Sequence, residues 1–525
     1  MTSATATTGT ALPTRTPPVV LLLVAATFIV ILNETIMVNA IPHLMDDFGV
    51  SLRAAQWLST IFLLTMAAVI PVTGWFLQRV TTRRAYATAM ATFCAGTALC
   101  LVAPVFEVLL VGRVVQAAGT AVMMPLLMTT LMTVVPADDR GRVMGNVTLA
   151  MSCAPALGPA VSGVLLGVGS WRLIFGVVLP IALVISFLGL RRLEDVGEPQ
   201  AGSIDVPSLV LAGLGFAVLV YGISEIGGEQ AWWVPVGIAV LGAVLVGIFA
   251  RRQLLLQRGG SPLMDLRTLR ERTFTLSLLV MAVAFMAMLG AMILLPQYLQ
   301  NARGLTALET GLLVAPGGLA MGLLGPTVGR CYDRFGARVL VVPGSLAILG
   351  SLLLFSRIGL DTPYAVLVGM HLVMMVGLAM LFTPVFTLGL GSLPPHLYSH
   401  GSSILGTLQQ VAGAMGTAAV VVITTVRADH LVASGVPDTE AFVGGLHGAF
   451  LAGAAAAVLV VVLAALLPAR VDAEGMPHGG PLDTDEQHHA LDGEAGDGSD
   501  DGSDDGADDG ADDEIDGVDE VVVTV

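Results

Sequence analysis

The chain contains no lysine, and charge of either sign is scarce outside its C-terminal tail. Among 525 residues there are 24 arginines and 40 acids, so charged residues make up only 12% of the sequence. A soluble protein carries about twice that fraction. Half of the acids, 20 of 40, follow Arg470, where no arginine occurs. Residues 1–470 therefore carry 24 arginines against 20 acids, and the total charge of −16 describes the tail rather than the body.

Metal-binding and catalytic motifs are also missing. The chain has four cysteines, with no CxxC pair and no histidine at ligand spacing, so we predict neither a metal site nor a cofactor. No GxxxxGK[ST] loop exists to bind ATP, and no HExxH pair or activated nucleophile is visible. The sequence therefore predicts a protein that is not an enzyme, uses no ATP and binds no nucleic acid.

Long apolar runs are what the sequence does contain. Hydrophobic residues make up 55% of the chain, and stretches of about 20 residues, enough to cross a bilayer as a helix, recur from Pro18 to Pro468. The first stretch is too long for a cleaved signal peptide. We predict an all-α polytopic membrane protein with fourteen spans, near residues 18–41, 55–77, 85–104, 108–134, 143–168, 171–190, 206–227, 231–250, 274–299, 309–329, 339–356, 364–390, 401–426 and 445–468.

The distribution of arginine predicts the orientation in the membrane. If the first span starts in the cytoplasm, the inner loops and termini hold 18 arginines and the outer loops hold five. This imbalance follows the positive-inside rule. An even number of spans then leaves both termini in the cytoplasm, with the protein in the plasma (inner) membrane.

An internal repeat divides the chain into two halves. "GWFLQR" (Gly74 to Arg79) has the spacing of "GRCYDR" (Gly329 to Arg334), 255 residues later. Transporters often use such repeats to build two bundles that move about a central cavity. We predict a disordered lead (1–17), a six-helix bundle (18–190), two inserted helices (191–273), a second six-helix bundle (274–468) and a disordered acidic cytoplasmic tail (469–525). The tail could remain a solvated segment, recruit divalent ions, repel the anionic leaflet or bind a basic partner.

Polar residues interrupt several predicted spans. "FIVILNETIMVNAIPHL" places Asn33, Glu34 and Asn39 in the first span, where a carboxylate costs a few kcal/mol. "GRVVQAAG" places Arg113 and Gln116 in the fourth span. With Thr120, they stand at i, i+3 and i+7 and form one polar stripe. Arg113 could instead extend its side chain to the outer headgroups.

These motifs together resemble the major facilitator superfamily, and within it the fourteen-span drug:proton antiporters of the lincomycin-resistance type. The likeness covers about residues 20–468 and rests on "LNETIMVNAIP", "GRVVQAAG", "APALGPAVSG" and "GRCYDRFGAR". The family's Asp on the first span would fall at Asn33, and the first copy of the loop motif has Gln78 in place of its Asp. The resemblance implies a major facilitator fold and alternating access of the two bundles.

The resemblance also assigns roles to residues. A mid-span antiporter motif would include Gly158, Pro159 and Gly163, with Gly163 and Gly167 forming a small-residue face for tight packing. The loop motif would supply a conformational latch in which Asp333 forms ion pairs with neighbouring arginines. Its members in the two halves are Gly74, Arg79, Arg83, Gly329, Asp333, Arg334, Gly336 and Arg338.

Proton coupling and substrate binding need polar groups within the membrane. We predict that Glu34, at a depth similar to that of Arg113, carries the proton, with Glu225 and His371 as further coupling candidates. The predicted substrate-cavity residues are Asn33, Asn39, Gln116, Thr120, Gln409 and Gln410. The predicted activity is proton-driven export of drugs or similar amphiphilic small molecules. A proton-coupled uptake symporter and a non-transporting sensor or scaffold remain alternatives.

Overall fold

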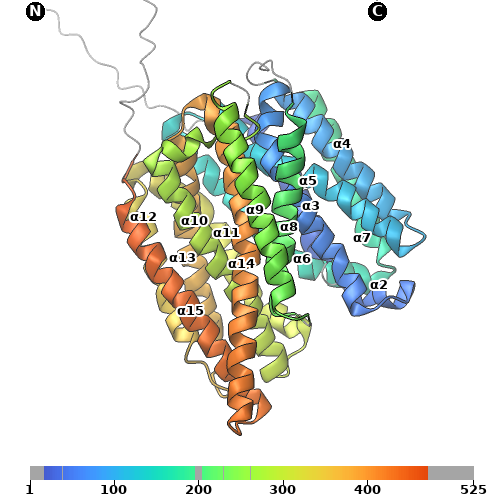
Figure 1. Ribbon diagram of the computed structural model, residues 1–525, viewed down its shortest axis with the longest axis vertical. Helices are drawn as coiled ribbons and strands as arrows, with labels where there is room; N and C mark the ends of the chain where they lie inside the picture. The colour runs from blue at the N-terminus through green and yellow to red at the C-terminus, as the bar shows by residue number, and fades with distance from the viewer. Residues whose placement is uncertain (1–16, 38–39, 196–203, 229, 260–261, 471–525) are drawn as a thin grey trace, which may run out of the picture. The chain divides into compact units, whose positions relative to one another are not determined.

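The protein is described from a computed structural model that covers residues 17–37, 40–195, 204–228, 230–259 and 262–470. Asn39 and the predicted disordered ends, apart from residues 17, 469 and 470, lie outside these described residues. Within them, a long helix stands at each of the fourteen predicted span positions, and no strand occurs. The fold is therefore all-α, as predicted (Figure 1).

The fourteen long helices follow the predicted spans to within a few residues at most ends. Twelve are long and apolar enough to cross a membrane; α4 and α6 form helices but are not among these twelve. The bounds are α1 Pro18–Met37, α3 Leu52–Arg79, α4 Thr82–Leu101, α5 Phe106–Val134, α6 Arg140–Val168, α7 Arg172–Arg192, α8 Val206–Ser224, α9 Trp233–Leu256, α10 Arg272–Gln297, α11 Ala307–Phe335, α12 Arg338–Phe355, α13 Tyr364–Gly391, α14 Tyr398–Ala433 and α15 Asp438–Leu466.

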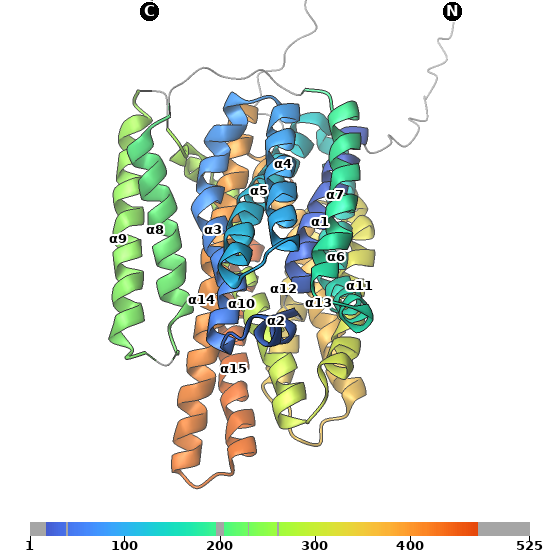
Figure 2. The same cartoon turned by 90° about the vertical axis from the view of Figure 1, so that its right-hand side faces the viewer.

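Short elements occupy several of the turns. The eight-residue helix α2 (Ile41–Phe48) follows α1, and three 3-10 turns and one π turn lie elsewhere: η2 Ala137–Asp139, η3 Leu266–Arg270, η4 Tyr298–Ala302 and η5 Pro395–Leu397. We call the end of the helices that carries α2 the α2 end. The opposite end, where α3, α5, α11 and α13 finish, holds 17 of the arginines among the described residues and is called the arginine-rich end (Figure 2).

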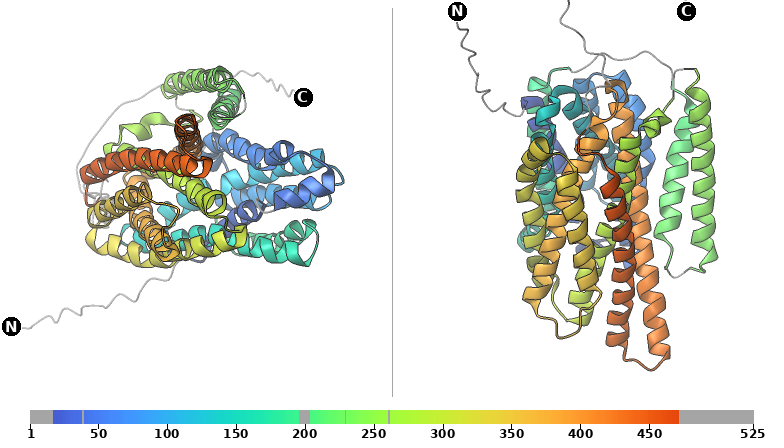
Figure 3. Two further views of the ribbon diagram at one scale, coloured as in Figure 1. Left: turned by 90° about the horizontal axis from the view of Figure 1, so that it is seen from below. Right: turned by 90° about the vertical axis from the view of Figure 1, so that its left-hand side faces the viewer.

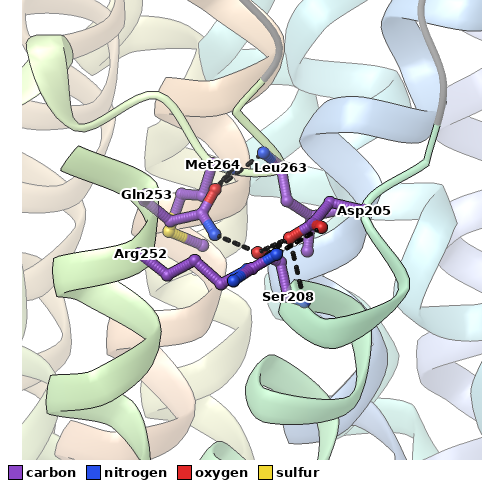
Figure 4. A network of polar contacts seen from close by, with 6 residues as sticks. All are labelled: Asp205, Ser208, Arg252, Gln253, Leu263 and Met264. Carbon is purple, nitrogen blue, oxygen red and sulfur yellow. Dashed lines mark hydrogen bonds and ion pairs between the residues drawn. The ribbon is translucent and has the colours of Figure 1, made fainter. Parts of the chain in front are cut away.

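Helices α8 and α9 form the inserted pair. Figures 2 and 3 show them side by side, next to α3 and α14. Figure 4 shows how their arginine-rich ends are joined: Arg252 binds Asp205 through two bonds of 2.7 and 2.8 Å. The hydrogen bond from Arg252 lowers the pKa of the Asp205 carboxyl. Gln253, which is fully buried, donates to Ser208 and accepts from the backbone of Leu263, so it ties the pair to the segment before α10.

The two bundles, α1 with α3–α7 and α10–α15, pack closely through glycines at the arginine-rich end. A Cβ at Gly145 of α6 would lie 2.2 Å from the Gly325 carbonyl oxygen of α11, and one at Gly329 would lie 2.0 Å from the Gly141 carbonyl oxygen. Both helices thus present a Gly-x-x-x-Gly face, which allows their backbones to approach. A larger side chain at these positions would push the bundles apart.

The same faces separate toward the α2 end. Gly163 stands 18 residues, or five turns, from Gly145, so both lie on one side of α6. Gly311 has the same relation to Gly329 on α11. No heavy atom lies within 4 Å of the Cβ position at Gly163, Gly167 or Gly311. The predicted tight packing at Gly163 and Gly167 is therefore wrong for this conformation, because α6 and α11 diverge before reaching them.

Candidate functional site

Arg113 is buried in the first bundle, with 1% of its surface exposed. Its Nε donates to the carbonyl of Leu58 on α3 at 3.3 Å, and its Nη1 donates to Gln116 at 2.7 Å. The guanidinium also lies 4.1 Å from the ring centre of Phe62. These contacts hold the charge inside the protein, so the alternative in which Arg113 extends to the headgroups is wrong.

A chain of hydrogen bonds continues from Arg113 into α4. The Gln116 amide donates to the Thr97 hydroxyl at 2.8 Å, and that hydroxyl donates to the Phe93 carbonyl. Thr120 donates to the Gln116 carbonyl within α5. A Cβ at Gly96 would lie 2.4 Å from the Gln116 backbone nitrogen, so only glycine permits this approach. Gln116 and Thr120 are buried supports of Arg113 in this conformation, with their polar groups already bonded.

Glu34 lies on α1, partly buried, and interacts electrostatically with Arg113. The helices that carry these two charges, α1 and α5, pack against each other, which agrees with the similar depths estimated from the sequence. The α1 backbone beside Glu34 is held by α6: Ser162 donates to the Ile36 carbonyl at 2.9 Å. A Cβ at Gly158 would lie 2.4 Å from the Thr35 hydroxyl, so this glycine packs directly against the turn that carries Glu34.

Asn33 is more deeply buried than its neighbour Glu34. Its side chain is fully buried, and neither its amide nitrogen nor its amide oxygen has a hydrogen-bond partner within the described residues. Successive residues on a helix point about 100° apart, so Asn33 and Glu34 face different surroundings. The residue at the position of the family's Asp is thus buried here, and the neighbouring carboxylate of Glu34 interacts electrostatically with Arg113.

The remaining coupling and cavity candidates lie on other elements. Glu225 caps the end of α8 in the inserted pair. His371 is 2% exposed on α13 and packs against α11, where a Cβ at Gly317 would lie 2.4 Å from its ring. Gln409 and Gln410 are partly buried on α14. The side chain of Pro159 is not described.

Asp333 joins the two bundles at the arginine-rich end. Its two carboxylate oxygens accept from the backbone N–H groups of Gly141 and Arg142, at 2.8 and 2.7 Å, at the start of α6. A carboxylate is stabilised there by the unpaired N–H groups and by the helix dipole. Within the part of the chain that the structure describes, the predicted ion pairs of Asp333 with Arg334 and Arg338 are not formed: Arg334 lies over the ring of Phe335, and Arg338 is exposed.

The first-half copy of the loop motif has an amide, Gln78, where the second half has the carboxylate of Asp333. Gln78 donates from its Nε2 to the carbonyl of His396, just before α14, at 2.8 Å. Gly74 packs against His400 of α14, Arg79 lies over the ring of Trp75, and the backbone of Arg83 donates to Asp195. Both copies therefore contact the start of a helix in the opposite bundle, as the repeat implies.

Gly336 belongs to the second copy of the loop motif and lies just after α11. Its φ of +82° is in the left-handed region that favours glycine, and a Cβ there would lie 2.3 Å from the Ala469 carbonyl oxygen. Ala337 donates to that carbonyl, and Arg470 donates to the last carbonyls of α11. The segment after α15 thus braces the helix that carries Asp333.

Small polar side chains form hydrogen bonds across the contact between the bundles. Thr148 and Thr383 bond at 2.8 Å, Thr129 and Ser402 at 3.1 Å, and Ser403 donates to the Ile70 carbonyl at 2.6 Å. Sequence reasoning missed this surface. Its only signals were the two Gly-x-x-x-Gly patterns and the run of Ser and Thr opening α14. Such a polar contact can be replaced by water when the bundles part, since each group can then bond to solvent.

Comparison with known proteins decides the family. The Major Facilitator Superfamily model matches residues 23–417, more than half of the chain. The chain belongs to the major facilitator superfamily. It is 37% identical over 447 residues to the lincomycin resistance protein LmrB of Listeria monocytogenes, covering 84% of this chain and 94% of that protein. The multidrug resistance protein B homolog of Mycobacterium tuberculosis is 30% identical over 402 residues, covering 76% and 74%.

Solved structures show the same fold. The human organic anion transporter MFSD10 superimposes with a TM-score of 0.61 at 16% identity, over 86% of this chain and all of that chain. The proton:xylose symporter XylE superimposes with a TM-score of 0.57 at 15% identity, over 86% and 95%. At these identities the likeness establishes the major facilitator fold and nothing about substrate.

Replacing Arg113 should impair transport far more than replacing an arginine outside the bundle. In Arg113→Ala, Gln116 loses its donor and Glu34 loses its cation, so we expect more than a tenfold loss of transport. Arg303 is a poor control because it bonds Tyr298 and the Thr362 carbonyl. The exposed Arg357 is better matched, and Arg357→Ala should change uptake into vesicles less than twofold. Equal small effects from both would contradict a role for the buried charge.

Proposed function

We propose that the chain is a proton-coupled antiporter that exports drugs or similar amphiphilic small molecules from the cytoplasm. The observation that carries the proposal is the presence of two opposite charges within one membrane bundle: the partly buried Glu34 on α1 and the buried Arg113 on α5, a helix that packs against α1. Such costly groups are retained in membrane helices chiefly for function. The names of the relatives, which refer to lincomycin and multidrug resistance, support the substrate class.

The positive-inside rule assigns the arginine-rich end to the cytoplasm. With that assignment, the bundles are closed toward the cytoplasm and diverge toward the outside, so the structure corresponds to an outward-facing state. Asp333, Gln78 and the threonine and serine pairs form the closed cytoplasmic gate. Opening this gate and closing the α2 end would produce the inward-facing state of alternating access.

A proton cycle follows from the position of Glu34. In the outward-facing state the carboxylate takes up a proton from outside, and neutral Glu34 no longer attracts Arg113. Losing that attraction lets α1 shift against α5 and favours the switch to the inward-facing state. There the proton leaves to the cytoplasm and substrate binds. The membrane potential supplies about 2.3 kcal/mol per charge per 100 mV for the return of a proton.

A drug-susceptibility panel tests the proposal and identifies substrates. The chain is expressed in an efflux-deficient host, with Glu34→Gln as the matched inactive control, and inhibitory concentrations are measured for lincosamides and cationic amphiphiles. Raised tolerance to at least one compound, lost in Glu34→Gln, is the expected result. Increased sensitivity would indicate uptake by symport. No change for any compound, with normal membrane expression, would favour a sensor or scaffold.

Two truncations test whether transport requires the acidic tail. Removing residues 472–525 is expected to leave transport and membrane expression unchanged, because no predicted span or motif lies beyond Arg470. Removing residues 469–525 should lower thermal stability, since Ala469 and Arg470 bond to Ala337 and to the end of α11. Fluorescence-detected size exclusion after heating measures both variants. Loss of transport in the shorter deletion would contradict this assignment.

A further inference from the structure

A buried histidine lies at the closed gate and takes no part in the mechanism above. His400, in the first turn of α14, is 3% exposed, and its Nδ1 has no hydrogen-bond partner within the described residues. Gly74 of α3, in the other bundle, packs directly on it: a Cβ at Gly74 would lie 3.0 Å from that Nδ1. We infer that His400 is a second proton-binding residue, which opens the cytoplasmic gate when it is protonated from the cytoplasm.

Burial in the closed gate disfavours the imidazolium. The cation would carry N–H groups on both ring nitrogens, and the one on Nδ1 would point at the α3 backbone without an acceptor. A buried donor without a partner loses its bond to water and gains nothing in return. Neutral imidazole avoids this cost because its unprotonated nitrogen needs no acceptor. The closed gate is therefore stable only with neutral His400.

The charged neighbours of His400 reinforce this preference. Three titratable or charged groups interact with it: Asp265 beside η3, Arg79 on α3 and His396 in η5. Asp265 attracts an imidazolium, whereas Arg79 and protonated His396 repel it. Arg79 belongs to the first bundle, across the gate from His400. Asp265 opens the turn η3, which packs against α10 and α14 of the second bundle.

Opening the gate changes the surroundings of His400 in ways that each favour its protonated form. When α3 leaves α14, His400 gains water and loses the repulsion of Arg79, while Asp265 stays with the second bundle. All three changes favour the imidazolium. By linkage, protonation must favour the open gate to the same extent. Acidification of the cytoplasm should thus shift the transporter toward the inward-facing state, at most tenfold per pH unit for one proton.

The inference rests on the proposed alternating access, and its test avoids both substrate and Glu34. In a cysteine-free Glu34→Gln background, spin labels are placed at the exposed positions Arg83 and Arg338, on opposite bundles at the arginine-rich end. Dipolar spectroscopy then gives the distance distribution between them at pH 8 and pH 5.5. We expect the long-distance population to rise several-fold on acidification.

Added to this background, His400→Gln should abolish the response. His430→Gln, an exposed histidine on the same helix, should leave it intact. Asp265→Asn should shift the response to lower pH without removing it, which a purely structural role of His400 would not produce. An unchanged response in His400→Gln, or none in the parent, would overturn the inference. Because Glu34 is absent throughout, a failure of proton-driven export would leave this test unaffected.

Discussion

Gly145→Leu should abolish transport and hold the arginine-rich end open. The Cβ of any residue at position 145 would lie 2.2 Å from the Gly325 carbonyl oxygen, and a backbone atom cannot move aside as a flexible side chain can. The α6–α11 contact would then be lost, together with the bonds from Gly141 and Arg142 to Asp333. The label pair at Arg83 and Arg338 should report only long distances at every pH.

The matched control lies on the same face of the same helix. Gly163→Leu should leave the arginine-rich end closed, because no heavy atom lies within 4 Å of that Cβ position. The two variants therefore differ only in which end of α6 carries the added side chain. Normal transport by Gly145→Leu would show that the close glycine contact is not needed for the cycle.

Glu34→Gln should eliminate proton-driven export while substrate binding changes less than about threefold. Glutamine keeps the shape of the side chain but cannot release a proton, so only the coupling is removed. Glu225→Gln, on the inserted pair, is the matched control and should retain export. Transport assays with and without a pH gradient, combined with substrate binding to purified protein, measure the two effects separately.

A double variant tests whether a carboxylate at position 33, where the family has its Asp, can replace the one at position 34. In the double variant Asn33→Asp, Glu34→Gln, the charge would move about 100° around α1 into a fully buried place, where the Asn33 amide has no hydrogen-bond partner among the described residues. A buried carboxylate without a partner is costly, so we expect no rescue and lower stability. Restored export would mean that Arg113 is reached from both positions.

The sequence predicted the helices because their signals are local. Runs of about 20 apolar residues placed all fourteen. The structure adds side-chain caps at the starts of α3, α4 and α11, formed by Ser51, Thr81 and Thr306, which the apolar runs do not predict. The predicted pairing of Glu34 with Arg113 also rests on local information, namely their depths along two helices. These features depend only on spacing along the chain and on the thickness of a bilayer.

The partners of the gate could not be predicted in the same way. "GRCYDRFGAR" showed a carboxylate among arginines and suggested ion pairs, but Asp333 instead accepts two backbone N–H groups from the other bundle. No residue pattern within one segment specifies such a partner. The prediction of tight packing at Gly163 was wrong for a related reason. A face of small residues shows that another helix can pack closely there, but it does not show in which conformation of the protein this happens.

Proton movement in everted membrane vesicles tests the central claim most directly. Respiration acidifies the lumen, a transported drug from the susceptibility panel is added outside, and a pH-sensitive dye follows the lumen. The account predicts that drug addition releases protons from the lumen in vesicles with the wild-type chain and in Glu225→Gln, but not in Glu34→Gln. Proton entry into the lumen on drug addition, no movement in the wild type, or wild-type release by Glu34→Gln would contradict it.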